Sequence, residues 1–311
     1  MIHRFVGQPI KTKKNIYTRF YSFNTFIGRN MVETPFENIK KILSNQIPKD
    51  LIRKIPDKWG KTGDVLTIKL PTRLKKYKKE IGKKYAEVLN CKTVLNDIGG
   101  ISGKYRTPNV ELIYGSKKTE TIHKENGIKY KLDPQKIMFS SGNIDERLRM
   151  ANISNTNEIV VDLFAGIGYF TIPIAVYSKP KKIYACEINP SSYDYLCTNI
   201  VINNVVSIVE PLKGDNREIS PRNIADRVII GYFSDIHEFL PTAITCLKNY
   251  TGIIHYHNTF PDKIVPETPL KTIKKIAGQY ERKIKLLKCK HVKTYAPGIS
   301  HFVLDIQIGG Q

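Results

Sequence analysis

The sequence predicts an α/β protein in which a doubly wound, mainly parallel sheet follows a small α+β domain. The sheet is predicted from residue 159 onward, where strand-like and helix-like runs alternate in the order β-α-β-α-β-α-β. Such alternation is typical of a parallel sheet covered by helices on both faces. The smaller domain is predicted because residues 109–115 and 118–133 read as antiparallel strands, with a strong hairpin turn at Asn126-Gly127.

The individual runs set the expected order of elements along the chain. In the smaller domain, residues 65–70 alternate like a strand that ends at Pro71, residues 85–89 read as helical, and residues 143–151 predict a connecting helix. In the larger domain the alternating runs are residues 158–164, 169–178, 182–188, 191–204, 226–233, 236–250 and 252–257. We therefore expect a basic N-terminal extension or small subdomain (1–50), an α+β domain with the linking helix (51–155) and a doubly wound α/β domain (156–311).

The charge of the chain is large and unevenly distributed. Its 311 residues include 50 Lys and Arg against 28 Asp and Glu, a net charge of +22. Residues 1–155 hold 32 basic and 14 acidic side chains, whereas residues 156–311 hold 18 and 14. This surplus indicates a polyanionic partner or an anionic membrane, and its asymmetry is expected when one half docks nucleic acid. Because no apolar run approaches ~20 residues, we expect no membrane span.

Two basic segments and the cysteines each leave an alternative open. The first 32 residues contain no acid, as in a mitochondrial transit segment, but Pro9 and the cluster at 11–14 interrupt an amphipathic helix and favour a basic RNA-binding arm or subdomain. Residues 73–84 are either a solvated lysine-rich helix or a phosphate-binding face. The five cysteines include no C-x-x-C pair, which favours buried thiols in a reducing compartment over a zinc ribbon or disulfide framework.

The strongest motif is VDLFAGIGYF at residues 161–170. A hydrophobic strand ends in an acid, and a glycine turn then leads into a helix whose N-terminus favours negative charge. The two glycines let the backbone bend sharply and approach a ligand closely. A dinucleotide site is disfavoured because the third glycine of G-x-G-x-x-G is absent. The residues that we expect to form one side of a nucleoside site are Asp162, Phe164, Gly166 and Gly168.

Two further polar motifs follow the next strand-like runs. Glu187, in ACEINP, is an acid placed to accept both hydroxyls of a ribose. Asp215 and Asn216, in GDNR, offer a carboxylate and a backbone N–H to the edge of an adenine. Because the carboxyl ends of parallel strands meet at one edge of a sheet, the three motifs together predict a single adenosine site.

These residues carry a family resemblance. DLFAGIGYFTIPIA, CEINP and GDNR resemble the class I methyltransferase-type enzymes that act on the guanosine just 3′ of the tRNA anticodon. The resemblance extends upstream over KYRTPNVELIYG, ETIHKENGIKYKLD and MFSSGNIDERLRMA, and covers about residues 51–308. It implies a Rossmann-like catalytic domain (156–311) that binds S-adenosylmethionine as the donor, an α+β domain (51–155) that docks tRNA, and tRNA as the substrate. We expect a cytoplasmic monomer that needs no metal.

Two segments distinguish between two sister activities of this family. The guanosine N1-methyltransferases typically carry Tyr-Phe-Ser-Pro-Arg-Leu before the linking helix, where this chain has MFSSGN at residues 138–143. They also carry Asn-Leu-Pro after the fourth strand of the cofactor domain, where this chain has Gly-Tyr-Phe at residues 231–233. Both departures resemble the archaeal wybutosine-pathway 3-amino-3-carboxypropyl transferases. The resemblance thus implies transfer of that group to a tricyclic guanosine with release of 5′-methylthioadenosine, and N1-methylation is the alternative.

The same resemblance implies roles for single residues. Ser140 and Arg147 should touch the donor, Glu187 its ribose, and Asp215 with Asn216 its adenine. Without the family, Ser140 and Arg147 would read as a loop hydroxyl and a surface helix charge. Our candidate general base is Glu146, with His255 and His257 as further candidates, for which the alternative is a structural place at a strand end. An RNA-binding protein with a vestigial pocket is a third hypothesis, which the intact adenosine motifs disfavour.

Overall fold

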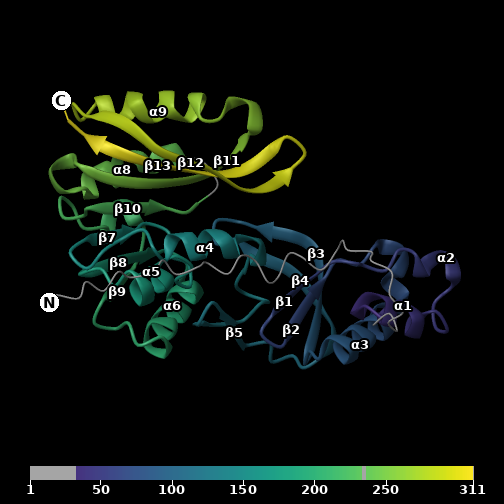
Figure 1. Cartoon of the computed structure of the whole chain (residues 1–311). Helices are drawn as coiled ribbons and strands as arrows, with labels where there is room; N and C mark the ends of the chain where they lie inside the picture. Colours follow the sequence, from purple (N-terminus) through teal and green to yellow (C-terminus); the bar gives the residue numbers. More distant parts are fainter. Residues whose placement is uncertain (1–32, 233–235, 311) are drawn as a thin grey trace, which may run out of the picture.

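The computed structural model describes residues 33–232 and 236–310. It consists of a smaller N-terminal domain beside a larger C-terminal domain that is built on a seven-stranded sheet (Figure 1). The predicted fold, a mainly parallel α/β sheet preceded by a small α+β domain, is confirmed. The N-terminal arm or transit segment expected at residues 1–32 lies outside the described residues.

The N-terminal domain packs helices against one sheet of four strands in the order β1-β2-β3-β4. Strands β2 and β3 are parallel and are joined by a helical crossover, whereas the other two pairs are antiparallel. The lysine-rich run forms this crossover, and β1 and β3 are additions to the prediction. The elements are α1 (Pro35–Leu43), α2 (Lys49–Ile52), β1 (Trp59–Thr62), β2 (Val65–Ile68), η1 (Thr72–Tyr77), α3 (Lys78–Leu89), β3 (Thr93–Ser102) and β4 (Thr107–Gly115).

Helix α1 belongs to the core of this domain. Thr34 and Glu37 form a capping box that satisfies N–H groups at its first turn. The buried side chains of Ile39 and Leu43 lie in one hydrophobic cluster with Tyr85 of α3. The packing of this domain therefore begins upstream of residue 51. A boundary at residue 50 stays a prediction, and the burial of α1 favours an earlier one.

The hairpin of β5 (Thr121–Glu125) and β6 (Ile128–Leu132) packs against the larger domain. Tyr130 of β6 and Met150 of the linking helix α4 (Ile144–Met150) share a hydrophobic cluster with side chains of α5 and α6. The backbone N–H of Lys131 also donates to the side chain of Asn199 on α6, at 2.7 Å. The predicted hairpin turn and linking helix are both present. Burial assigns them to the C-terminal domain, whereas the expected boundary lies at residue 155.

The larger domain is built on seven strands in the order β12-β13-β11-β10-β7-β8-β9. The five strands from β11 to β9 are parallel. Buried side chains of α5 and α6 cover one face, and those of α8 and α9 cover the other. The elements are β7 (Ile159–Asp162), α5 (Thr171–Tyr177), β8 (Lys182–Glu187), α6 (Pro190–Ile202), β9 (Val209–Lys213), α7 (Asn216–Ile219), β10 (Arg227–Ile230), η3 (Ile236–Phe239), α8 (Leu240–Cys246), η4 (Lys248–Tyr250), β11 (Gly252–Pro261), η5 (Asp262–Ile264), α9 (Glu267–Gly278), β12 (Lys283–Ala296) and β13 (Ile299–Gly309).

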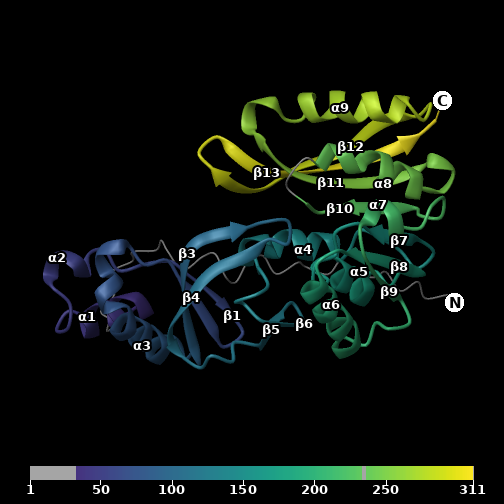
Figure 2. The same cartoon turned by 180° about the vertical axis from the view of Figure 1, so that it is seen from behind.

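The last two strands are an antiparallel addition to the predicted parallel sheet. β13 pairs with β11, and β12 pairs with β13 and forms the edge of the sheet. The hairpin of β12 and β13 projects toward the side on which the N-terminal domain lies (Figures 1 and 2). Lysines are a common means of protecting an exposed edge strand from pairing with other chains. Those on β12 are Lys283, Lys285, Lys288, Lys290 and Lys293.

Neither a membrane span nor a metal cluster is found in residues 33–232 and 236–310. No helix of these ranges is long and apolar enough to cross a bilayer. No group of three or more His, Cys, Asp or Glu side chains in them is arranged to hold a metal ion. The five cysteines are all unpaired, and Cys186 and Cys246 are buried.

The assignment of the β5–β6 hairpin to the larger domain gives a testable prediction. Tyr130 is only 1% exposed, so Tyr130→Ala leaves a cavity in the main core and should lower the free energy of unfolding by roughly 3–5 kcal/mol. Ile122→Ala on the same hairpin is the control, because Ile122 is 47% exposed and its loss should cost about 0.5 kcal/mol or less. Denaturant unfolding of the full chain measures both. Equal effects of the two substitutions would show that the hairpin is not part of that core.

Candidate active site

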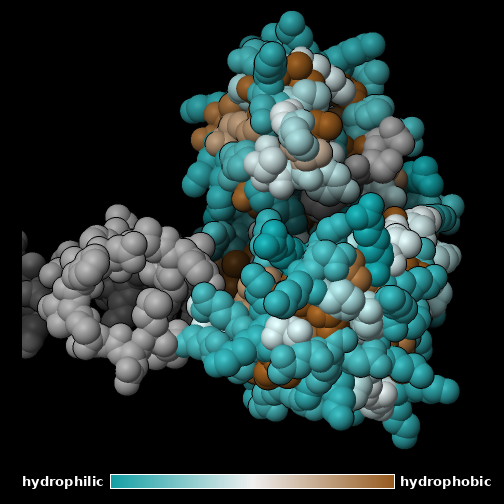
Figure 3. All heavy atoms as spheres, turned by 90° about the vertical axis from the view of Figure 1, so that its right-hand side faces the viewer, coloured by the Kyte–Doolittle hydropathy of each residue, from teal (hydrophilic) through white to brown (hydrophobic). Residues whose placement is uncertain are grey.

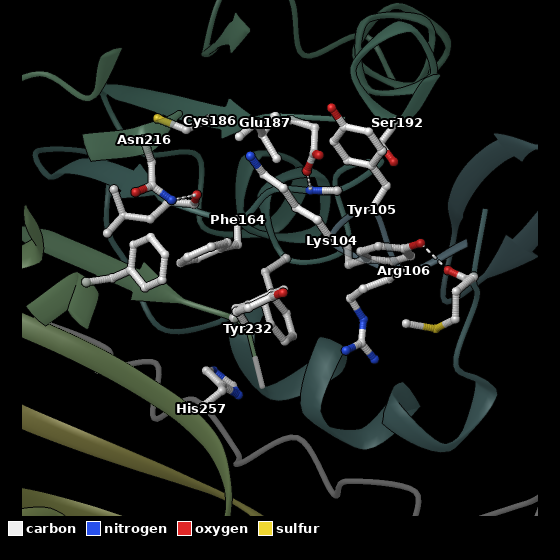
Figure 4. Close-up of a pocket in the computed structure, with 18 of the residues that line it drawn as sticks. Lys104, Tyr105, Arg106, Phe164, Cys186, Glu187, Ser192, Asn216, Tyr232 and His257 are labelled. Atoms are coloured by element: carbon white, nitrogen blue, oxygen red, sulfur yellow. Dashed lines mark hydrogen bonds between the residues drawn. The ribbon is translucent and has the colours of Figure 1, made fainter. Parts of the chain in front are cut away.

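A cleft lies at the carboxyl edge of the parallel strands, as the three sequence motifs predict. Its floor comes from the segments that follow β7, β8, β9 and β10, and its opposite wall from residues 137–147 and the tip of the β3–β4 hairpin. Figure 4 shows Phe164 and Asn216 on one side of this cleft and Tyr105 and Arg106 on the other. The predicted site residues that line it are Ser140, Arg147, Phe164, Gly166, Glu187, Asp215 and Asn216.

Glu187 is held in a fixed orientation at the end of β8. Its Oε2 atom accepts a hydrogen bond from the backbone N–H of Gly166 at 2.8 Å, and its Oε1 atom accepts one from that of Asn189 at 2.7 Å. Burial raises the pKa of the Glu187 carboxyl, and these backbone donors oppose the rise. A carboxylate has about four acceptor positions, so each oxygen keeps one for a further donor. The two hydroxyls of a ribose match this arrangement.

Asp162 and Gly168 shape the glycine loop from behind the cleft. Asp162 is buried, and its carboxylate accepts from the backbone N–H of Phe164 at 3.2 Å and from the hydroxyl of Thr171 at 2.7 Å. Burial raises the pKa of Asp162 to about 6. Gly168 has φ of +96°, and a Cβ there would lie 2.5 Å from Cγ1 of Ile172. Neither residue lines the cleft, so both position the loop instead of meeting a ligand directly.

The adenine side of the cleft combines polar and aromatic groups. Asp215 caps α7 and also pairs with Arg217, with Oδ2 and Nη2 2.6 Å apart, which lowers the pKa of the Asp215 carboxyl. The Asn216 amide donates to the carbonyl of Leu163 at 2.8 Å, and its buried Oδ1 has no partner among the described residues. Phe164 stacks on Tyr232 with ring centroids 5.1 Å apart. The flat aromatic pair and the free amide oxygen suit a purine.

Arg147 fixes the wall opposite the adenosine motifs. Its guanidinium makes two 2.6 Å hydrogen bonds to the carboxylate of Glu125 and one of 2.9 Å to the carbonyl of Ser140. It also lies over the ring of Phe139, 4.7 Å from the centroid. Arg147 is 3% exposed. Arg147 therefore binds the β5–β6 hairpin through a buried bidentate ion pair and the linking segment through the Ser140 carbonyl, and it lines the cleft between them.

The candidate general bases occupy very different positions. Glu146 is fully buried and pairs with Arg149 at 2.7 Å and with Lys290 at 2.9 Å, and it does not line the cleft. Both of its carboxylate oxygens are engaged by these cations, so its role as the base stays a prediction that the geometry does not favour. His255 also lies outside the cleft, where it bridges Arg227 and Asp305.

His257 is the candidate that lines the cleft. Its ring stacks on Phe170 with centroids 4.9 Å apart, its Nδ1 lies 3.3 Å from Nε2 of His301, and its buried Nε2 has no hydrogen-bond partner among the described residues. Burial holds the pKa of His257 well below its usual range. Its Nε2 atom lies 3.9 Å from Oε1 of Glu146. A lowered pKa makes the ring a weaker proton acceptor, so the role of His257 as a base stays a prediction.

Several lining residues were not predicted from the sequence. Lys104, Tyr105 and Arg106 come from the tip of the β3–β4 hairpin, and the side chain of Asn189 donates to the carbonyl of Tyr105 at 3.4 Å. The glycines at residues 99, 100 and 103 signal a turn, but they do not tell which part of the chain it meets. Tyr169, whose hydroxyl donates to the carbonyl of Met138, lies inside the predicted loop and has no polar signature of its own.

The fold and the cleft define a class I methyltransferase-type enzyme with an adenosine site at the sheet edge. Comparison with family models gives the same result in more detail: residues 121–287 match the TRM5/TYW2 methyltransferase domain, and residues 39–119 match the TYW2 N-terminal domain. The chain belongs to the TRM5/TYW2 family. The family resemblance inferred from the sequence motifs is therefore confirmed.

Two archaeal relatives and two solved structures show how far the similarity extends. A Pyrococcus horikoshii protein named tRNA(Phe) (4-demethylwyosine(37)-C(7)) aminocarboxypropyltransferase is 46% identical over 87% of this chain and 96% of its own length. Trm5b of Pyrococcus abyssi, a tRNA (guanine(37)-N(1))-methyltransferase, is 36% identical over 90% of this chain and 85% of its own length. P. horikoshii TYW2 in complex with MeSAdo superposes with a TM-score of 0.78 at 44% identity, covering 88% of this chain and 98% of that one. The complex of aTrm5 with tRNALeu gives 0.76 at 29% identity, covering 91% and 84%.

The ribose site gives a direct test by ligand binding. Glu187→Ala removes two charge-assisted hydrogen bonds to a nucleoside, so the affinity for S-adenosylmethionine should fall roughly tenfold to hundredfold. Glu210→Ala is the control, because Glu210 lies on the neighbouring β9, pairs with Lys182 and does not line the cleft. Calorimetric titration of the full-length variants measures both. Unchanged affinity in the Glu187 variant would contradict the ribose assignment.

Proposed function

We propose that this chain transfers the 3-amino-3-carboxypropyl group of S-adenosylmethionine to a tricyclic wyosine-type guanosine beside the tRNA anticodon. The relative from P. horikoshii and a second from Methanocaldococcus jannaschii, each 46% identical to this chain, both carry the aminocarboxypropyltransferase name. The N1-methyltransferase relative is less similar, at 36%. The product expected beside the modified tRNA is 5′-methylthioadenosine, in a pathway to a wybutosine derivative.

The observation that carries this choice lies at the end of β10. Gly231 lines the cleft without a side chain, and the ring of Tyr232 stacks on Phe164. A side-chain amide, which the resemblance associates with guanosine methylation, is absent from these two positions. A Cβ on Gly231 would lie 3.3 Å from Cε2 of Phe170, so a longer side chain here would have to extend into the cleft. This arrangement supports a donor whose methionine tail, and not its methyl group, faces the acceptor.

The proposed reaction is a displacement at the Cγ atom of the donor. A ring carbon of the acceptor base attacks Cγ, the new C–C bond forms, and the Cγ–S bond breaks with its electron pair passing to sulfur. The sulfonium thereby becomes the neutral thioether of 5′-methylthioadenosine, and a base removes the proton from the ring carbon that has attacked Cγ. Attack in line at about 3–3.5 Å requires the cleft to fix the donor at both ends. Of the candidate bases Glu146, His255 and His257, His257 is the one that lines this cleft. No step of the proposed reaction needs a metal.

Isotope labelling tests the reaction type. S-adenosylmethionine labelled in its carboxyl carbon should mark wyosine-type tRNA, and methyl-labelled donor should leave it unlabelled. The physical reason is that the whole tail is transferred while the methyl group leaves with sulfur. Scintillation counting of the purified tRNA measures both arms, with unmodified tRNA as the control. The opposite labelling pattern would favour the N1-methyltransferase alternative and leave the adenosine site unaffected.

We also propose that the N-terminal domain docks the tRNA through the lysine-rich crossover. Figure 3 shows a mainly hydrophilic surface over this end of the molecule, where the N-terminal domain lies below the C-terminal one. Lysines that are exposed and free of carboxylate partners among the described residues suit phosphate contacts, which give affinity without sequence information. Those on η1 and α3 are Lys75, Lys76, Lys79 and Lys83. That the protein acts as a monomer stays part of the proposal. Action in the cytoplasm is also part of it, because the five unpaired cysteines suit a reducing compartment.

Charge neutralisation tests this docking surface in the full chain, because truncation at residue 156 would remove part of the main core. Changing the four crossover lysines together to Gln should weaken tRNA binding and reduce the slope of log K against log salt by about 0.7–0.9 for each phosphate that is no longer neutralised. The control changes exposed lysines of α9 to Gln, at Lys271, Lys274 and Lys275. Filter binding across a salt series measures both variants. Equally weakened binding in the two sets would show that general charge, and not this surface, binds the tRNA.

A further inference from the structure

The order of the strands fixes the direction in which a bound donor runs along the sheet edge. The residues expected to contact the adenine follow β9, the residue expected to contact the ribose ends β8, and the glycine loop follows β7. The next strands in the same direction are β10, β11, β13 and β12. A donor whose adenosine lies over β8 and β9 therefore extends its methionine tail away from them, toward the linking segment and the β12–β13 hairpin.

Lys293 lies beside the far end of this path, next to the lining residue Ser140 and outside the residues that line the cleft themselves. On β12 it is paired through His301 of β13 with Thr259 of β11, two residues beyond His257. Its Nζ atom donates to the hydroxyl oxygen of Ser140 at 2.7 Å, and Ser140 lines the cleft. Its Cδ atom lies 3.4 Å from where a Cβ on Gly142 would stand. Lys293 therefore contacts the linking segment from β12, the edge strand at the end of the sheet away from β9.

The Lys293 ammonium has no anionic partner among residues 33–232 and 236–310. Its hydrogen-bond partner there is a neutral hydroxyl, whereas Lys290 on the same strand pairs with Glu146 at 2.9 Å. Burial, followed by the nearby guanidinium groups of Arg147 and Arg106, lowers the pKa of Lys293, and no acid opposes this. A partly buried cation that has lost water without gaining a counter-ion is stabilised by an anionic ligand.

We propose that Lys293, together with Ser140, binds the α-carboxylate of the methionine tail of S-adenosylmethionine. The hydroxyl oxygen of Ser140 accepts from Lys293, so its own O–H is free to donate to the same carboxylate. The donor is then held at both ends, by Glu187 at the ribose and by Lys293 at the carboxylate. The Cγ atom lies between these two anchors, where the acceptor must reach it. The identity of the ligand rests on the proposed function.

Decarboxylated S-adenosylmethionine isolates the predicted interaction, because it keeps the adenosine, the sulfonium and the amine. In Lys293→Met, which retains most of the aliphatic stem, the affinity for S-adenosylmethionine should fall roughly tenfold to hundredfold. The affinity for the decarboxylated compound and for 5′-methylthioadenosine should stay at the wild-type value. Lys293→Arg should retain most of the affinity for S-adenosylmethionine. Lys285→Met, an exposed lysine of the same strand, is the matched control and should change none of these values.

Calorimetric titration without tRNA gives all of these values, and unchanged binding of the decarboxylated compound also shows that the variant is folded. Equally reduced affinity for S-adenosylmethionine and the decarboxylated compound would overturn the proposal and make Lys293 a part of the cleft wall. Full affinity of the Lys293→Met variant for S-adenosylmethionine, with weakened tRNA binding in the filter assay, would also overturn the proposal. The anion that Lys293 binds would then be a tRNA phosphate. The labelling experiment fails or succeeds independently, since it reports which carbon is transferred and not what holds the carboxylate.

Discussion

The buried ion pairs of helix α4 are the interaction on which the rest of the site depends. Arg147 faces one way, to Glu125 of the β5–β6 hairpin, and Arg149 faces the other way, to Asp305 of β13 at 2.7 Å. Removing one partner of a buried pair leaves an uncompensated charge, at a cost of about 3–5 kcal/mol. The helix therefore cannot shift without breaking contacts on both sides. The position of α4 fixes Ser140 and the wall of the cleft. The β5–β6 hairpin, which α4 holds through Glu125, follows directly after the N-terminal domain in the chain.

The cleft is consequently made of two halves with different origins. The adenosine half comes from short, contiguous loops after β7, β8 and β9, where backbone N–H groups orient Glu187 before any ligand binds. The other half comes from two distant parts of the chain, the linking segment and the tip of the β3–β4 hairpin. Lys293 of β12 donates to Ser140 at its border. We propose that family members share the adenosine half and differ in the other half, and that this second half selects whether the methyl or the Cγ atom of the donor meets the acceptor.

This division also explains how much the sequence alone predicts. The parallel sheet and the hairpin at Asn126-Gly127 follow from local patterns, and the structure has both. The expected place of Glu187 in the cleft follows in the same way, and its contact with the ribose stays a prediction. Asp162 and Gly168 belong to the motif but lie behind the cleft, because a motif does not tell a ligand contact from a loop support. Glu146 is neutralised by Lys290, which is 144 residues away, and no local pattern reveals such a pairing. The β12–β13 hairpin and the domain limits likewise depend on long-range packing.

In the orientation that we propose, the donor lies along the sheet edge with its tail, and not its methyl group, facing the acceptor. A crystal structure of the full chain with intact S-adenosylmethionine shows this orientation directly. We predict that the ribose hydroxyls contact Glu187, that the carboxylate lies within hydrogen-bond distance of Lys293 and Ser140, and that the methyl group points into the protein. A donor with its methyl group facing the open cleft and its tail folded over the glycine loop would contradict the claim.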